Sequence, residues 1–169
     1  FEGTASFGDT TLTSAGGSDV FIAKLNADGT YAWATKSGGS GRDYGSGITS
    51  LSDGSSIVTG NKAGAVSFGD TTLDSSAGGV FIAKLNADGT YAWATSAGGG
   101  GTDYGNGITS LSDGSSIVTG TFSGTARFGD ETLISTGSGD VFIAKLNADG
   151  EYEWATKAGG RSVDYGHGI

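Results

Sequence analysis

Short stretches in which apolar and polar side chains alternate recur along the whole chain. VFIAKLN (20–26) and TYAWAT (30–35) are rich in β-branched and aromatic residues, and they are joined by an Asp-Gly turn. GITSL (47–51) and SSIVTG (55–60) form a second pair, joined by Ser-Asp-Gly. Alternation with a period of two is typical of half-buried strands, and glycine supplies the positive φ that hairpin turns require. No segment shows the period of an amphipathic helix, so the pattern predicts β-hairpins throughout.

The two hairpins belong to a longer repeat. FIAKLNADGTYAWAT occupies 21–35 and 81–95 letter for letter, and FIAKLNADGEYEWAT occupies 142–156. The repeat units span roughly 1–61, 62–121 and 122–169, the last of them incomplete. The chain starts and stops in mid-unit and contains no methionine, so we expect a piece of a longer precursor or a mature form that has lost an export signal.

Four strands in two hairpins per unit predict an all-β fold, a β-propeller of four-stranded antiparallel blades. Each blade exposes two apolar faces that only its neighbours can cover, so identical blades solve the same packing problem at every interface. Simple alternation places Tyr31, Trp33 and Thr35 on one face of their strand and Ala32 and Ala34 on the other. The FGDTTL segment between the hairpins (68–73) should form a small extra hairpin around Gly69-Asp70 or an ordered loop.

Ring closure requires more than this chain supplies. Propellers contain about 4–8 blades, and the sequence of 169 residues holds about three units. An isolated arc would leave apolar blade faces and strand edges in water. We therefore expect the ring to be closed by further repeats of a longer polypeptide or by a second chain, as a homo-oligomer.

Composition narrows the function classes. The chain carries 18 acidic and 9 basic residues, a net charge of −9, which argues against binding to nucleic acid. There is no cysteine, and the single histidine, His167, leaves little scope for zinc, haem or triad chemistry. No apolar run reaches the roughly 20 residues of a membrane helix. We expect no membrane insertion, no cofactor, no metal and no catalytic residues.

The repeat resembles a known family. DVFIAKLNADGTYAWAT, followed by GG, DYG, GIT and SSIVTG, is similar to the bacterial SBBP-type β-propeller repeat, and the match covers the chain apart from the FGDTTL segment. This resemblance implies the propeller fold and leaves the function open, because fold does not determine function. The acidic, cysteine-free, Gly/Ser/Thr-rich composition is in the style of bacterial secreted or cell-surface proteins.

The DYG loops are the candidate binding site. They precede the predicted innermost strand of each blade, and loops there form one face around the channel mouth of a propeller. Loop sequence varies on this face, with Arg42, Thr102 and Val163 in equivalent places, whereas the turns NADG and LSDG on the opposite face are constant. Two interpretations stay open: the aspartates cap backbone N–H groups and the tyrosines pack between blades, or these side chains bind a ligand. The candidate residues are Asp43, Tyr44, Asp103, Tyr104, Asp164 and Tyr165.

Other repeated residues favour structural roles. Trp33, Trp93 and Trp154 occupy identical strand settings, which favours packing between blades over a sugar-stacking platform. The turn aspartates precede glycine, and their spacing lacks the density of oxygen ligands that calcium requires.

The function predicted from these observations is a non-enzymatic extracellular or cell-surface scaffold. Its binding face would carry the DYG loops, with a protein or glycan as the partner. A lectin-like propeller is the alternative, with one shallow sugar pocket per blade, formed by an aromatic and acidic pair such as Tyr44 and Asp43.

Overall fold

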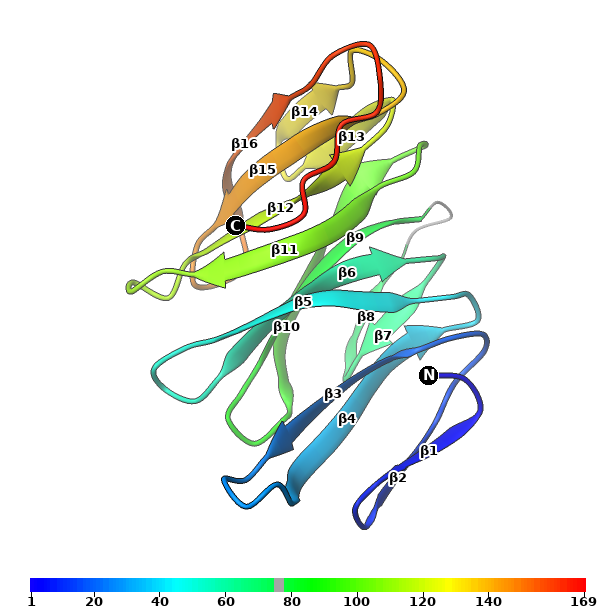
Figure 1. The fold of residues 1–169 in the computed structure, drawn as a ribbon, viewed down its shortest axis with the longest axis vertical. Coiled ribbons are helices and arrows are strands. Elements are labelled where there is room, and N and C mark those ends of the chain that lie inside the picture. Colours follow the sequence, from blue (N-terminus) through cyan, green and yellow to red (C-terminus); the bar gives the residue numbers. More distant parts are fainter. Residues whose placement is uncertain (75–77) are drawn as a thin grey trace.

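The fold is all-β, and its strands form three stacked layers (Figure 1). The computed structural model describes residues 1–74 and 78–169, which contain strands and no helix, and thus no helix able to cross a membrane. Layer 1 holds β3 (Val20–Leu25) and β4 (Tyr31–Gly39). Layer 2 holds β5 (Tyr44–Ser50), β6 (Ser56–Lys62), β9 (Gly79–Leu85) and β10 (Tyr91–Gly99) in that order. Layer 3 repeats this order with β11 (Tyr104–Ser110), β12 (Ser116–Phe122), β15 (Asp140–Leu146) and β16 (Tyr152–Ala158).

The segment between the second and third strands of each unit forms a small hairpin, as expected around Gly69-Asp70. The three hairpins are β1 (Thr4–Phe7) with β2 (Thr10–Thr13), β7 (Val66–Phe68) with β8 (Thr71–Leu73), and β13 (Thr125–Phe128) with β14 (Glu131–Ile134). The segment predicted to fold this way extends into residues 75–77, which lie outside the described residues.

The hairpins also connect neighbouring layers. β7 leaves layer 2 and pairs with the end of β4 in layer 1, and β13 leaves layer 3 and pairs with the end of β10 in layer 2. The hydrogen-bonded sheets therefore contain two, six, four and four strands, not separate sets of four. The second and third hairpins therefore act as straps, each from its own layer to the layer before it.

The hairpin turns have the predicted chemistry. Gly29 and Gly54 both adopt φ of 84°, a region open to glycine at little cost. The carboxylate of Asp28 accepts hydrogen bonds from the amide and the hydroxyl of Thr30, and Asp53 does the same for Ser55. The hydroxyl hydrogen bond is the main reason why the pKa of Asp28 lies below its usual value.

The two faces of each layer carry different side chains. Cross-strand partners in layer 1 are Leu25 with Tyr31 and Lys24 with Trp33, so Ala32 is an extra residue in a β-bulge. The bulge turns Tyr31 onto the face opposite Trp33 and Thr35, which corrects the grouping predicted from simple alternation. We call one face of layer 1, with its equivalents, the phenyl face (Phe21, Ala23, Leu25, Tyr31, Ala34) and the other the indole face (Val20, Ile22, Trp33, Thr35, Ser37).

The core lies between layers, where the indole face of one packs on the phenyl face of the next. One core cluster joins Val20, Ile22 and Trp33 of layer 1 to residues of layer 2 such as Phe81 and Leu85. The second cluster joins layers 2 and 3 through the equivalent positions. In layer 3, the buried and half-buried residues of β15 alternate strictly, because only its phenyl face has a neighbouring layer.

The phenylalanine of each FGD hairpin completes the phenyl face. Phe68 lies between Phe81 and Tyr91, with ring centroids 5.1 and 5.5 Å away. Phe7 and Phe128 have the same two aromatic neighbours in their own units. The FGD hairpin is thus part of the core as well as a strap.

Two of the three tryptophans, Trp33 and Trp93, lie at a junction between layers, whereas Trp154 is exposed on the outer face of layer 3. The indole N–H of Trp33 donates to the carbonyl of Ala87, at 3.0 Å, in the turn of the next layer. Trp93 makes the same contact with Ala148 at 3.1 Å. A Cβ on Gly89 would lie 2.7 Å from the Trp33 ring, so this turn needs glycine for close packing as well as for its positive φ.

One buried tyrosine has a partner across the junction and its equivalent does not. The hydroxyl of Tyr91 is hydrogen-bonded to that of Ser37 in the preceding layer, and burial raises its pKa to about 12. Ala97 replaces the serine at the next junction, and the buried hydroxyl of Tyr152 has no partner. Burial likewise raises the pKa of Tyr152.

We predict that Ala97→Ser raises the free energy of unfolding by about 1 kcal/mol, the usual net value of one hydrogen bond, because it gives the Tyr152 hydroxyl a partner. Ser37→Ala should lower it by a similar amount. Urea denaturation measures both changes. Ala158→Ser, at the equivalent exposed position of β16, is the matched control and should change little. Loss of stability in Ala97→Ser would contradict the prediction.

Candidate functional site

The three DYG segments lie next to one another on one side of the stack. β5, β11 and the segment 165–169 are neighbours in Figure 1, and they contact through residues about sixty positions apart. The hydroxyls of Thr49 and Ser110 are 3.1 Å apart, and the Asn106 side-chain amide donates to the carbonyl of Gly166 at 2.7 Å. The segments therefore run parallel, and their tyrosines begin them at the same end.

The DYG aspartates hold the backbone of their own loops. Asp43 is buried, and its carboxylate accepts from the amides of Gly39 at 3.0 Å and Ala63 at 2.8 Å. Asp103 is held in the same way by the amides of Gly99, at 2.8 Å, and Ser123, at 3.3 Å.

The third loop keeps part of this arrangement. Asp164 is half-buried and accepts from the amide of Gly160 at 2.8 Å. Each carboxylate therefore fixes the glycine-rich loop before it, and the first two also tie that loop to the end of a second strand.

The pKa values of the two buried carboxyls, Asp43 and Asp103, are shifted in the same direction. Burial raises the pKa of Asp43 and of Asp103, and the amide hydrogen bonds that each accepts oppose this shift. The nearby charge of Asp19 adds to the rise at Asp43. Both carboxylates are buried, so they offer little accessible surface to a ligand, and their hydrogen bonds serve the backbone of the loops.

The DYG tyrosines are exposed. Tyr44, Tyr104 and Tyr165 show 46%, 43% and 60% of their surface to solvent. The ring of Tyr165 stacks on that of His167 at 5.9 Å with 18° between the planes. Because the three tyrosines occupy the same end of adjacent parallel segments, they form a row of aromatic rings that we call the DYG rim. Arg42, Thr102 and Val163, the variable loop positions beside it, are exposed too.

Of the six candidate residues, the structure therefore gives the three aspartates and the three tyrosines different surroundings. The aspartates point into their loops and the tyrosines face solvent. The carboxylate and the ring of one DYG motif do not form a joint exposed pair.

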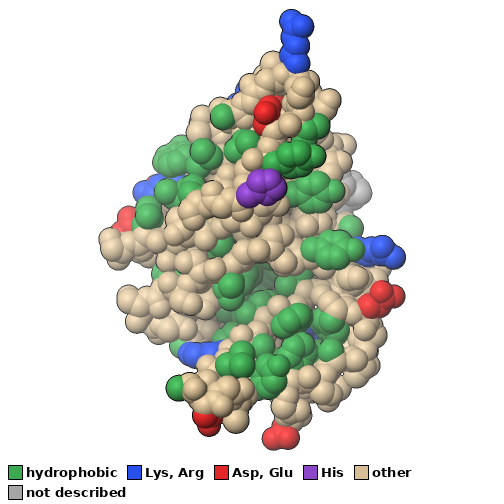
Figure 2. Space-filling view, in the orientation of Figure 1, with side chains coloured by type: hydrophobic (Ala, Val, Ile, Leu, Met, Phe, Trp, Pro, Cys, Tyr) green, Lys and Arg blue, Asp and Glu red, His purple; other side chains and the backbone are tan. Residues whose placement is uncertain are grey.

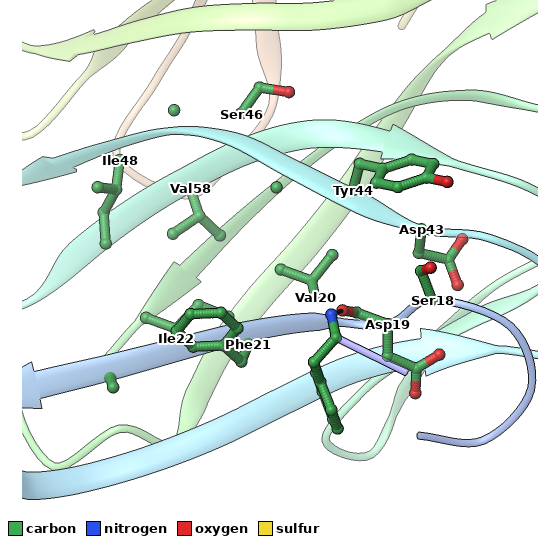
Figure 3. Close-up of a pocket in the computed structure, with 14 residues that line it drawn as sticks. Ser18, Asp19, Val20, Phe21, Ile22, Asp43, Tyr44, Ser46, Ile48 and Val58 are labelled. Carbon is green, nitrogen blue, oxygen red and sulfur yellow. Dashed lines mark hydrogen bonds between the residues drawn. The ribbon is translucent and has the colours of Figure 1, made fainter. Parts of the chain in front are cut away.

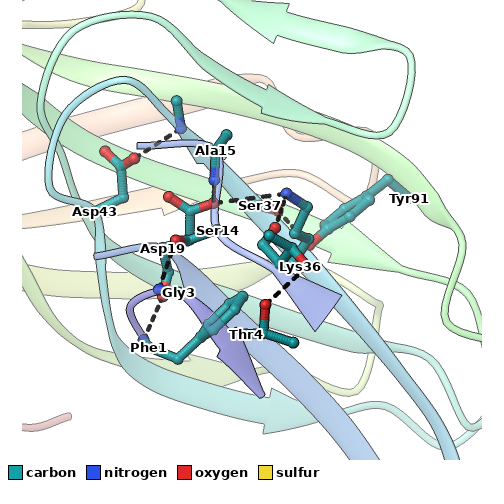
Figure 4. A network of polar contacts seen from close by, with 12 residues as sticks. Phe1, Gly3, Thr4, Ser14, Ala15, Asp19, Lys36, Ser37, Asp43 and Tyr91 are labelled. Atoms are coloured by element: carbon teal, nitrogen blue, oxygen red, sulfur yellow. Dashed lines mark hydrogen bonds and ion pairs between the residues drawn. The ribbon is translucent and has the colours of Figure 1, made fainter. Parts of the chain in front are cut away.

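A polar network that the sequence analysis did not identify lies around Asp19, at the start of β3 (Figure 4). Asp19 is buried, accepts from the amide of Ala15 at 2.8 Å, and lies 3.8 Å from the ammonium of Lys36. The same pair recurs in layer 3 as Asp140 and Lys157, at 2.6 Å. The lysine hydrogen bond is the main reason why the pKa of Asp140 is lowered.

Layer 2 lacks both members of this pair, with Gly79 and Ser96 in their places. In the sequence, the sign of this pair was that both residues are replaced together in the second repeat unit. A buried carboxylate without its cation would be costly, so the two positions change together.

The exposed groups of the site can contact a partner by stacking and by hydrogen bonding. Among residues 1–74 and 78–169, no three His, Asp or Glu side chains converge as a possible metal site. Figure 2 shows hydrophobic and neutral polar groups over the centre of the face turned to the viewer, with most charged side chains near the outline. Exposed aromatic rings on a rigid β scaffold can stack on a planar or apolar partner and donate phenolic hydrogen bonds.

A scan against protein-family models and a search of curated proteins both found no match to the chain. Function is therefore argued from the geometry of the rim and of the layers.

We predict that Asp103→Ala lowers the free energy of unfolding, because two backbone amides lose their acceptor. An unsatisfied buried donor costs about 1–3 kcal/mol. The control is Asp113→Ala, whose carboxylate serves an exposed turn where water can replace it. Urea denaturation should show a clearly larger loss for Asp103→Ala. Equal losses in the two variants would contradict the structural role of the buried carboxylate.

Proposed function

We propose that the chain is part of an SBBP-type β-propeller, with the layers as blades and the DYG segments around the central channel. The packing of indole face on phenyl face at both junctions supports this, because the same contact can be repeated until a ring closes. The two end faces carry the unmatched halves of that contact. Phe21 is 49% exposed on the phenyl face of layer 1, whereas its equivalents Phe81 and Phe142 are fully buried.

The hydrogen bond between an indole N–H and the turn of the next layer also has only one of its two partners at each end of the stack. The exposed Trp154 occupies the position from which Trp33 and Trp93 bind the next turn. The turn at the other end is open, since a Cβ on Gly29 would have no atom within 4 Å. In the proposed ring, Trp154 donates to the Ala27 carbonyl of a further repeat unit. Either a longer repeat polypeptide or a second chain supplies that unit.

We predict that the 169-residue chain associates at micromolar concentrations, with a mass above the 16.7 kDa of one chain. Sedimentation equilibrium measures this. Trp154→Ala should weaken association because it removes one half of the junction, and Ile134→Ala, which removes an exposed side chain from β14, should not. A stable monomer with cooperative melting would contradict closure by self-association.

The function that the rim supports best is non-enzymatic binding by an extracellular or cell-surface scaffold. One observation carries it: the aspartates of the DYG motifs are held by their own loops, while the tyrosines form an exposed row. Rigid aromatic rings lose little conformational entropy on binding and are enriched at recognition surfaces. The partner proposed is a protein or a glycan that contacts the row.

The alternative is a lectin-like propeller. Stacking of a sugar ring on Tyr44 or Tyr104 favours it, since both rings are exposed. The burial of the Asp43 and Asp103 carboxylates weighs against it, because side chains that are 1% and 4% exposed offer little surface to sugar hydroxyls. Such a lectin would rely on the tyrosines and on backbone groups of the loops.

We predict that Tyr104→Ala weakens binding to a rim ligand about tenfold, equal to about 1.4 kcal/mol, with an unchanged melting temperature. A glycan array and a panel of purified extracellular matrix proteins are the probes. Tyr104→Phe tests the hydroxyl, and Ile134→Ala is the control outside the rim. Glycan binding would favour the lectin alternative and protein binding the scaffold. Binding that neither Tyr44→Ala nor Tyr104→Ala affects would contradict the rim as the site, as would turnover that requires a residue of the chain.

A further inference from the structure

Layer 2 differs from the other two layers at the start of its third strand in sequence order, β9. In layers 1 and 3 this position holds a buried aspartate, Asp19 or Asp140, whose carboxylate pairs with a lysine. Asp19 lies at the start of β3, near Asp43 (Figure 3). In layer 2 the aspartate and the lysine are replaced by Gly79 and Ser96. Layer 2 therefore lacks a buried negative charge that both other layers have.

A cavity lies at this place in layer 2. It measures about 420 Å³, and Gly79, Ser96 and Gly98 are among its lining residues. A Cβ on Gly98 would lie 3.2 Å from the Cα atom of Gly79, so the two glycines are neighbours. In layer 1 the equivalent glycine borders the aspartate, since a Cβ on Gly38 would lie 2.1 Å from the Cγ atom of Asp19. The cavity therefore includes the space that an aspartate carboxylate fills in layer 1.

Two cationic residues, Lys62 and Arg127, also line this cavity. Lys62 lies directly opposite Gly79 in the pairing of β6 with β9. Arg127, on the strap strand β13, lies directly opposite Gly98 of β10. The other two repeat units have phenylalanine in place of the lysine and serine in place of the arginine. Layer 2 thus has two cations beside the position where the other layers bury an aspartate.

Lys62 is the buried one of the two cations. It is 3% exposed, and its ammonium donates to the carbonyl of Gly64 at 3.1 Å. None of the described carboxylates forms an ion pair with it, and residues 75–77 contain no acidic side chain. Burial lowers the pKa of Lys62, and the charges of Asp43 and Asp74 oppose this shift. A buried cation is costly without an anion beside it, so the cavity favours a ligand that brings a negative charge.

The remaining polar side chains of the cavity can bind hydroxyl groups. Asp74 is exposed and accepts hydrogen bonds through its carboxylate, and the hydroxyl of half-buried Ser96 can donate and accept them. Because Asp74 repels an anion, the charged end of a ligand should lie toward Lys62 and Arg127, and its hydroxyl groups toward Asp74. The volume of the cavity is in the range of small-molecule binding sites, so it can hold more than a carboxylate group.

We propose that this cavity of layer 2 is a binding site for a sugar acid, a hydroxylated ligand with one carboxylate. The ligand carboxylate takes the place that the Asp19 carboxylate has in layer 1 and pairs with Lys62 and Arg127, and the hydroxyl groups bind Asp74 and Ser96. The site is distinct from the DYG rim, since the described residues that line it include no DYG tyrosine. It is built from strands inside the chain, so neither ring closure nor binding at the rim is needed for it.

The test uses the 169-residue chain, with D-glucuronate as the ligand and D-glucose as its uncharged match. Isothermal titration calorimetry at constant ionic strength should show saturable binding of glucuronate, and binding of glucose should be weaker by about tenfold or more. Sulfate, an anion without the hydroxyl groups of a sugar, should also bind about tenfold more weakly. Methyl β-D-glucuronide separates two sources of the ligand: it binds like glucuronate if the site accepts the end of a glycan chain, and it fails to bind if only the free acid fits.

Variants of the chain assign the binding to the cavity. Lys62→Met should weaken glucuronate binding about tenfold or more. It should not lower the melting temperature, because it removes a buried cation from a position that holds buried Phe122 in the third unit. Arg127→Gln, at an exposed position where the fold does not depend on the side chain, should weaken binding about threefold. Lys24→Met, at an exposed lysine outside the cavity, and Tyr104→Ala, on the DYG rim, should leave binding within about twofold.

The absence of saturable glucuronate binding would overturn the proposal, as would equal binding of glucose or tighter binding of sulfate. It is also overturned if Lys62→Met and Arg127→Gln both bind glucuronate like the unaltered chain. Binding that is lost in Tyr104→Ala and kept in Lys62→Met would place the sugar on the DYG rim, which overturns the cavity as the site and supports the lectin alternative.

Discussion

The structure depends on one repeated contact, the packing of an indole face on the phenyl face of the next layer. Neither face can be buried within its own layer, because each layer is a single sheet with apolar side chains on both sides. Stability must therefore come from neighbours, as in other repeat proteins. This explains why the fifteen residues that begin at Phe21 recur with so few changes: each copy has to fit the layer before it and the layer after it.

Polar groups fix how far one layer is displaced from the next. The Trp33 indole and the Ala87 carbonyl join a strand to a turn, and the strap formed by β7 joins the following layer to β4. These contacts occur at opposite ends of the strand, since Trp33 is near its start and Gly38-Gly39 are at its end. Apolar packing alone would allow the layers to slide, whereas two directional contacts at separate points define a single arrangement.

Much of the fold could be predicted from sequence because it depends on local chemistry. The alternating strands, the Asp-Gly turns and the FGD hairpin each have a signature within a few residues. The position of Tyr31 could not be predicted this way, because a bulge at Ala32 shifts the alternation and nothing in TYAWAT marks it. The pairing of each hairpin with the preceding layer is a tertiary contact and leaves no local pattern. At the candidate site, the motif located the loops, but the different surroundings of aspartate and tyrosine depend on the fold.

The internal copies make some of these tertiary contacts visible after all. Asp19 with Lys36 and Asp140 with Lys157 each pair a buried carboxylate with a partly exposed lysine, whereas Gly79 and Ser96 replace both partners together. Ala97 takes the place of Ser37 in the second unit although the tyrosine across the junction is kept, and the buried hydroxyl of Tyr152 is left without a partner. The two members of an ion pair change together because a buried charge without its partner costs much more free energy than a buried neutral hydroxyl without one. In a repeat chain, the units thus serve as their own comparison: the loop residues directly before each DYG motif, Arg42, Thr102 and Val163, are exposed and differ in all three units, so their identity is not fixed by packing between layers.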